Sequence, residues 1–166
     1  MKKVLVVVGI LVLALSLGAF AFQNEPEEFR GLLWGDPPTE EMKFLVDSDD
    51  MKAYTLPDDK MYLGDVTLYR IAYMFFEGRF TSVGLYYNGE DNYKLLETIC
   101  KERYGVQEVD EVSFYQMRWD GQKSFVILAY DFVKEGGYLA IGSTPITMEK
   151  MAAQKKKEAE KAAGDW

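Results

Sequence analysis

The stretch IAYMFFEGRFTSVGLYY, residues 71–87, contains two runs of β-branched and aromatic residues on either side of the pair Glu77-Gly78. Two such runs joined by a residue followed by glycine are typical of a β-hairpin with a two-residue turn. The sequence therefore predicts a strand over 66–76 and a second strand over 79–87, paired antiparallel.

Further elements of the same kind follow this hairpin. Residues 91–104 carry apolar side chains at helical spacing and stop at Gly105, which is typical of a helix end. After this helix the sequence predicts strands over 111–119 and 123–130, joined at an Asp-Gly pair, and a last strand over 138–143.

The chain before the hairpin is predicted to contain short strands over 29–34 and 51–56. Between these strands, Asp36 has the character of a helix N-cap and Pro37 suits the first helical position. We therefore expect a helix from Pro37 to about residues 44–46, so that a helix followed by a hairpin occurs twice in the chain.

This order predicts an α+β fold: a mostly antiparallel sheet of about six strands, built from two helix-then-hairpin units, plus a C-terminal helix. The predicted organisation along the chain is a signal peptide at 1–21, a polar leader at 22–28, a single α+β domain at 29–144, and a C-terminal helix with a charged tail at 145–166.

The N-terminal segment predicts export. Lys2 and Lys3 precede an apolar run over 4–17, and Ala19 and Ala21 are small residues at the spacing that a signal peptidase accepts. Cleavage after Ala21 would place the protein in the periplasm or outside the cell. The alternative is an uncleaved membrane anchor, because the uncharged run is just long enough to span a bilayer.

Composition excludes several classes of function. The net charge of −8 disfavours nucleic acids and anionic membrane surfaces as partners. The sequence contains no histidine, so we expect neither a Ser-His nor a Cys-His nucleophile nor an imidazole zinc site, and nucleotide-binding glycine motifs are also missing. We predict no catalytic residue, no metal and no cofactor, and we expect the single cysteine, Cys100, to be buried and inert.

Both faces of the predicted sheet are apolar, so both need cover. If side chains alternate strictly along the strands, one face carries Tyr69, Tyr73, Phe75 and Tyr86. The C-terminal helix, the leader, a partner protein or an apolar ligand are the candidates for covering this face. We take these four residues as candidate contact residues, since tyrosine offers a large contact area and a hydroxyl group.

The motif FRGLLWG, residues 29–35, resembles the opening of a group of uncharacterised exported bacterial proteins, which begin with Phe-x-Gly-x-x-Trp-Gly after a signal peptide. The resemblance extends to the IAYMFFEGRF hairpin, to the Trp119-x-Gly121 hairpin and to the Lys/Glu/Ala-rich tail that ends in GDW. It implies a small envelope domain of α+β type, and it implies no reaction or ligand. Within the motif, Phe29 and Trp34 are expected to be packing anchors rather than binding residues.

Three functions remain open at the level of sequence. The favoured one is an exported, non-enzymatic binding or accessory domain whose partner is an envelope protein or an apolar ligand. The second is a carboxylate-dependent hydrolase or a calcium-binding protein, although DSDDMK at 47–52 departs from a calcium loop at Met51 and Lys52. The third is a self-associating structural component whose sheet face is closed by a second copy.

Overall fold

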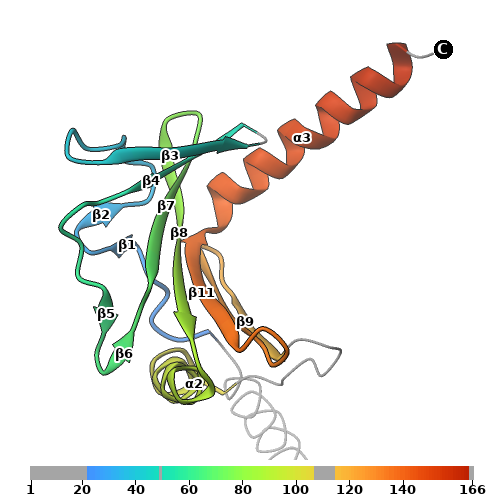
Figure 1. Ribbon diagram of the computed structural model, residues 1–166. Coiled ribbons are helices and arrows are strands. Elements are labelled where there is room, and N and C mark those ends of the chain that lie inside the picture. Colours follow the sequence, from blue (N-terminus) through green and yellow to red (C-terminus); the bar gives the residue numbers. More distant parts are fainter. Residues whose placement is uncertain (1–21, 49, 107–114, 165–166) are drawn as a thin grey trace, which may run out of the picture.

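The computed structural model describes residues 22–48, 50–106 and 115–164. Its centre is an antiparallel sheet of seven strands in the order β3-β4-β7-β8-β11-β10-β9 (Figure 1), so the α+β class is confirmed. The strands of this sheet are β3 (Lys43–Ser48), β4 (Met51–Thr55), β7 (Arg70–Phe76), β8 (Arg79–Asn88), β9 (Tyr115–Asp120), β10 (Ser124–Asp131) and β11 (Gly136–Ser143). The remaining elements are two small hairpins, β1 (Glu28–Phe29) with β2 (Leu32–Leu33) and β5 (Tyr62–Leu63) with β6 (Val66–Thr67), and the helices α2 (Glu90–Tyr104) and α3 (Thr144–Gly164).

The hairpin predicted from residues 71–87 forms the middle of the sheet. β7 and β8 pair antiparallel, and Phe76 lies opposite Arg79 across the turn. Glu77 and Gly78 have φ angles of 50° and 76°, so both adopt the left-handed conformation of a type I′ turn. The predicted strand over 66–76 is interrupted, because Val66–Thr67 pairs with β5 instead of continuing β7.

A β-bulge in β8 was not predicted from the sequence. The register between β7 and β8 shifts after Phe80, and Thr81 has no partner on β7. The Thr81 hydroxyl donates to the carbonyl oxygen of Arg79 at 2.9 Å and accepts from the backbone N–H of Phe76 at 3.2 Å. The extra residue reverses the alternation of side chains in β8 relative to β7.

The bulge changes which aromatic residues share a face. Tyr73 lies opposite Val83, on the same face as Phe75, whereas Tyr86 points to the other face. The predicted grouping of Tyr69, Tyr73, Phe75 and Tyr86 on one face is therefore wrong. Strict alternation assumed a hairpin without a bulge, and one inserted residue exchanges the two faces of everything that follows it.

The inner face of the sheet, which we define as the face toward α2 and the two small hairpins, holds the core (Figure 1). The helix α2 lies across one end of this face, while the β1–β2 and β5–β6 hairpins lie over the rest. The side chains of the inner face that are exposed by 2% or less include Tyr73, Phe75, Val83, Leu85, Tyr87, Met117, Trp119, Val126, Leu128 and Leu139.

The helix predicted after Asp36 is absent, and residues Lys43–Ser48 form the edge strand β3 instead. The Asp36 side chain accepts from the backbone N–H of Leu33 at 2.9 Å, so it closes a turn rather than capping a helix. The backbone of Gly35 and Asp36 also exchanges hydrogen bonds with Phe80, at 2.9 and 2.7 Å. These bonds attach the segment to the sheet, and the prediction of two helix-then-hairpin units is met only by α2 with β9 and β10.

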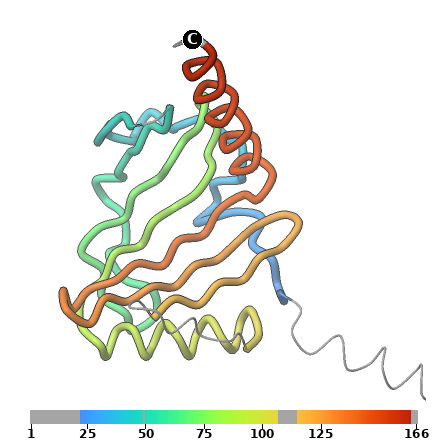
Figure 2. Tube along the Cα trace, turned by 90° about the vertical axis from the view of Figure 1, so that its right-hand side faces the viewer, coloured from blue at the N-terminus to red at the C-terminus, as the bar shows by residue number. Residues whose placement is uncertain are grey.

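The two helices that were predicted downstream are present. α2 ends at Gly105, whose φ of 96° and bond to the carbonyl of Lys101 fit the expected helix end. α3 projects away from the sheet (Figures 1 and 2). Its first half packs through Ile146 and Ala153 on the cluster of Met51 and Phe76, and Lys157 pairs with Asp50. On the outer face of the sheet, which is the face opposite the inner face, α3 therefore leaves the aromatic residues at the far end uncovered.

The predicted signal peptide at 1–21 and part of the predicted strand over 111–119 lie outside the described residues. In the described part of the chain, no helix is both long and apolar enough to cross a bilayer.

Candidate functional site

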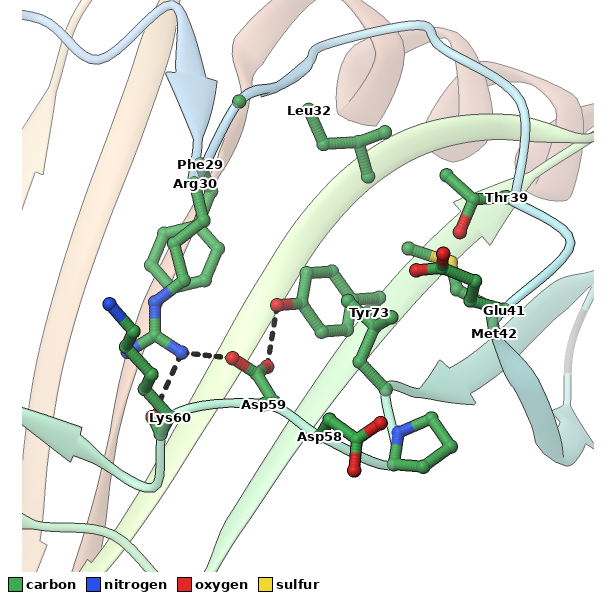
Figure 3. Close-up of a pocket in the computed structure, with 13 residues that line it drawn as sticks. Phe29, Arg30, Leu32, Thr39, Glu41, Met42, Asp58, Asp59, Lys60 and Tyr73 are labelled. Carbon is green, nitrogen blue, oxygen red and sulfur yellow. Dashed lines mark hydrogen bonds and ion pairs between the residues drawn. The ribbon is translucent and has the colours of Figure 1, made fainter.

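A cleft of about 730 Å³ opens over the inner face, between the β1–β2 turn and the loop that follows β4 (Figure 3). We call it the Tyr73 cleft, because the Tyr73 side chain of β7 lies at its floor. Its apolar walls come from Phe29 and Leu32 of the small hairpin and from Met42 and Leu56 on the opposite side. A recess of this size, with apolar walls and a few polar groups, is typical of a small-molecule site.

The β1–β2 turn places Arg30 at the edge of this cleft. Arg30 and Gly31 have φ angles of 52° and 84°, so the turn is again of type I′. A left-handed conformation is unusual for arginine and costs some backbone energy. Hydrogen bonds offset this cost, because the guanidinium contacts the carboxylate of Asp59 and donates to the carbonyl oxygens of Lys60 at 2.9 Å and Tyr62 at 2.8 Å.

Asp59 connects Arg30 to the floor of the cleft. The Tyr73 hydroxyl donates to Oδ2 of Asp59 at 2.6 Å, while Oδ1 of the same carboxylate faces Arg30 (Figure 3). The Asp59 side chain is only 7% exposed, so this carboxylate depends on its two partners. Burial, together with the neighbouring Asp59 charge, raises the pKa of Tyr73 well above its usual value. The hydroxyl therefore remains a hydrogen-bond donor and cannot act as a base near neutral pH.

The open side of the cleft carries further polar groups. Glu41, Asp58 and Thr39 are exposed and line the cleft around Tyr73 (Figure 3). Neither Glu41 nor Asp58 forms an ion pair within the described residues, so their carboxylates are available to a ligand. In the part of the chain that the structure describes, no group of three or more Cys, Asp and Glu side chains is placed to hold a metal ion.

The four predicted contact residues divide between the two faces. Tyr73 and Phe75 are each 1% exposed in the core, so neither is accessible to a protein partner. Tyr69 and Tyr86 lie together on the outer face with a centroid distance of 6.2 Å. Tyr138 of β11 extends this row at 6.4 Å from Tyr86. Tyr138 was not among the predicted contact residues, because its position opposite Tyr86 depends on the order of the strands.

The opening motif FRGLLWG is framework and also contributes to the cleft. As expected, Phe29 is buried, and Trp34 packs on Phe80 at a centroid distance of 4.9 Å. The indole N–H of Trp34 donates to the carbonyl of Pro26 at 2.8 Å. Arg30, which lies between these anchors, was not predicted as a site residue. The sequence feature that could have identified Arg30 is its position before Gly31 in a two-residue turn. A long side chain at this position points away from the hairpin.

Cys100 is buried on the inner side of α2, as predicted, with 1% of its surface exposed. Burial raises the pKa of the Cys100 thiol to about 12, so the thiolate is scarce at neutral pH. We expect the native protein to react with a disulfide reagent such as Ellman's reagent at pH 8 only as fast as it unfolds. Full reaction should appear in denaturant, and rapid reaction of the native protein would contradict this assignment.

No protein-family model matches the chain, and no curated protein and no solved structure is significantly similar to it.

Proposed function

We propose that this protein is an exported, non-enzymatic domain that binds a small ligand in the Tyr73 cleft. The observation that carries the proposal is the combination of a roomy, partly apolar recess with a fixed polar floor. Ligand sites in proteins combine apolar walls, which supply affinity, with a few placed polar groups, which supply orientation.

The polar groups of the cleft favour binding over chemistry. Tyr73 and Asp59 are already paired with each other and with Arg30, which leaves them no role as base or nucleophile. Glu41 and Asp58 remain for contacts with donor groups of the ligand. A rigid floor and an adaptable rim suit a receptor for a small molecule, because a fixed site loses little conformational entropy on binding.

Export is part of the same proposal, and it rests on the N-terminal sequence. The structure adds that Phe22, the first residue after the proposed cleavage point, packs edge-to-face on Tyr104 with a centroid distance of 5.5 Å. Cleavage after Ala21 would give a product that begins at Phe22. An intact mass that corresponds to this product, measured on protein recovered from the cell envelope or the medium, would support the proposal.

The cleft itself is tested with a matched pair of variants. Leu32 lines the cleft, whereas its neighbour Leu33 is 51% exposed and does not line it. Leu32→Trp should fill the recess, and Leu33→Trp should leave it open. We expect compounds found by protein-observed NMR, from a set of aliphatic amines, monosaccharides and aromatic carboxylates, to bind the wild type and Leu33→Trp. Leu32→Trp should weaken their binding at least tenfold.

One result would count against the cleft, and another would exclude the tested ligand classes. Compounds that bind Leu32→Trp as tightly as the wild type would place the ligand elsewhere. The absence of any binder among the three classes would exclude those ligand classes for this recess. Thermal unfolding of both variants serves as the control for folding.

A further inference from the structure

A second recess lies beside the Tyr73 cleft, underneath the N-terminal segment. Residues 22–28, which we call the strap, run along the open side of the inner face next to α2 and the β9–β10 turn (Figure 2). Between the strap, α2 and β11 is a cavity of about 440 Å³, which we call the strap cavity. Its volume lies within the range of small-molecule sites in proteins.

The strap is held by specific contacts rather than by loose packing. The backbone N–H of Gln23 donates to the carbonyl of Tyr104 at 3.1 Å, and the Asn24 side chain donates to the carbonyl of Arg103 at 2.7 Å. The Glu25 carboxylate accepts from the backbone N–H groups of Lys123 at 2.7 Å and Ser124 at 3.2 Å. These bonds hold the strap against the C-terminal end of α2 and against the β9–β10 turn.

The inner wall of the strap cavity is apolar. Ile99 and Cys100 of α2, Leu139 and Ile141 of β11, and Leu63 of β5 line it. Cys100 and Leu139 are at most 2% exposed, so the cavity reaches the core of the inner face. An apolar wall of this kind suits a hydrocarbon group.

The charged residues at the rim of the strap cavity indicate which polar group a bound hydrocarbon chain would carry. Glu25 and Glu27 also line the cavity, but their carboxylates are already bound at the β9–β10 turn, Glu25 by backbone N–H groups and Glu27 by Lys123. Arg103 lines the cavity and forms no ion pair within the described residues. An arginine fork without an acidic partner is suited to a carboxylate.

We propose that the strap cavity binds the hydrocarbon chain of an anionic amphiphile, a medium- or long-chain carboxylate, whose carboxylate lies at Arg103. The chain runs along Leu139 and Ile141 toward Phe29. Phe29 and Arg30 line both the strap cavity and the Tyr73 cleft, so the two recesses meet at the β1–β2 turn. This inference extends the proposed function from the cleft to a neighbouring cavity with its own lining residues.

Calorimetric titration of the full chain, as recovered from cells, with octanoate and decanoate below their micelle concentrations tests the apolar part. Burial of each methylene is expected to strengthen binding about fourfold, so decanoate should bind roughly fifteenfold more tightly than octanoate. Ile99→Trp, which fills the cavity, should abolish decanoate binding. The matched control is Leu95→Trp, since Leu95 is 41% exposed on the same helix and does not line the cavity.

Exchange of the head group of the ligand and of the charged residues at the rim tests the proposed position of the carboxylate. Arg103→Gln should weaken decanoate binding about tenfold and leave the binding of decanol unchanged. Glu28 lines the cavity and forms no ion pair within the described residues, so Glu28→Gln should strengthen decanoate binding at low salt. Both positions are exposed, so these variants keep the fold even if Ile99→Trp does not.

The outcomes separate this inference from the proposed function. Binding of decanoate that Leu32→Trp does not affect, and that Ile99→Trp removes, is the expected result. Decanoate binding that survives Ile99→Trp, or equal effects of Arg103→Gln on decanoate and decanol, would overturn the assignment of the chain or of the carboxylate. Neither failure affects the Tyr73 cleft, whose test uses different residues and different compounds.

Discussion

Replacement of Gly137 by alanine is expected to destabilise the protein by about 3 kcal/mol, near the upper end of what overpacking costs. A Cβ atom at this position would lie 2.2 Å from the carbonyl oxygen of Ala129 and 2.6 Å from the Tyr87 hydroxyl oxygen. Those two atoms form a buried hydrogen bond of 2.8 Å. The added methyl group would therefore have to displace both backbone and core, since Tyr87 has no exposed surface.

The adjacent glycine is the matched control for this prediction. A Cβ atom on Gly136 would approach the Asn88 side-chain oxygen at 3.0 Å, and an exposed side chain can move away. We expect Gly136→Ala to cost less than about 1 kcal/mol. Guanidinium unfolding followed by circular dichroism measures both variants. Equal losses of stability would contradict the close packing of Tyr87 under β11.

The elements that local chemistry specifies were predictable from the sequence. The pair Glu77-Gly78 and the aromatic runs around it gave the central hairpin, and Gly105 gave the end of α2. The signal at Asp36 was misleading, because the same residue and the proline after it suit a turn as well as a helix N-terminus. Pairing of Gly35 and Asp36 with Phe80 decides between the two, and no local pattern encodes that contact.

The bulge at Thr81 limited the prediction of the site more than any missing element did. Its hydroxyl satisfies Phe76 and Arg79, which are close in sequence, yet threonine is also common in regular strands. Without the bulge, Tyr73 is grouped with Tyr86 on one face; with it, Tyr73 lies in the core and Tyr86 outside. The bulge therefore explains the separation of Tyr86 from Tyr73, whereas Tyr69 precedes β7 and does not follow its alternation.

The polar network of the Tyr73 cleft could not be predicted from the sequence, for a different reason. Arg30 and Asp59 are 29 positions apart, and each occupies a turn, where charged residues are ordinary. The resemblance to exported proteins that begin with Phe-x-Gly-x-x-Trp-Gly concerned the anchors on either side of Arg30 and stays a prediction. The contact between the two turns arises only when β1–β2 packs over β7.

That network leads to the second prediction of large effect. Asp59→Ala should destabilise the protein by about 2–3 kcal/mol, because it leaves the buried Tyr73 hydroxyl without an acceptor and Arg30 without its counter-charge. The guanidinium is 25% exposed and keeps two carbonyl partners, so the cost stays below that of a fully buried pair. Asp58→Ala, next to it in the same loop, removes an exposed carboxylate without an ion pair and should cost less than about 0.5 kcal/mol.

The two neighbouring substitutions also separate a structural role from a binding role. If Asp59 holds the floor and Asp58 meets the ligand, Asp59→Ala should lower the free energy of unfolding. Asp58→Ala should leave that quantity unchanged and weaken the binding of ligands that carry an amine.

Tyr73→Phe completes a double-mutant cycle with Asp59→Ala. It should cost about 1 kcal/mol in the wild type and much less in Asp59→Ala, because the hydroxyl no longer has its partner there. Additive losses of stability would show that Tyr73 and Asp59 do not depend on each other, and the polar floor would then be two separate groups.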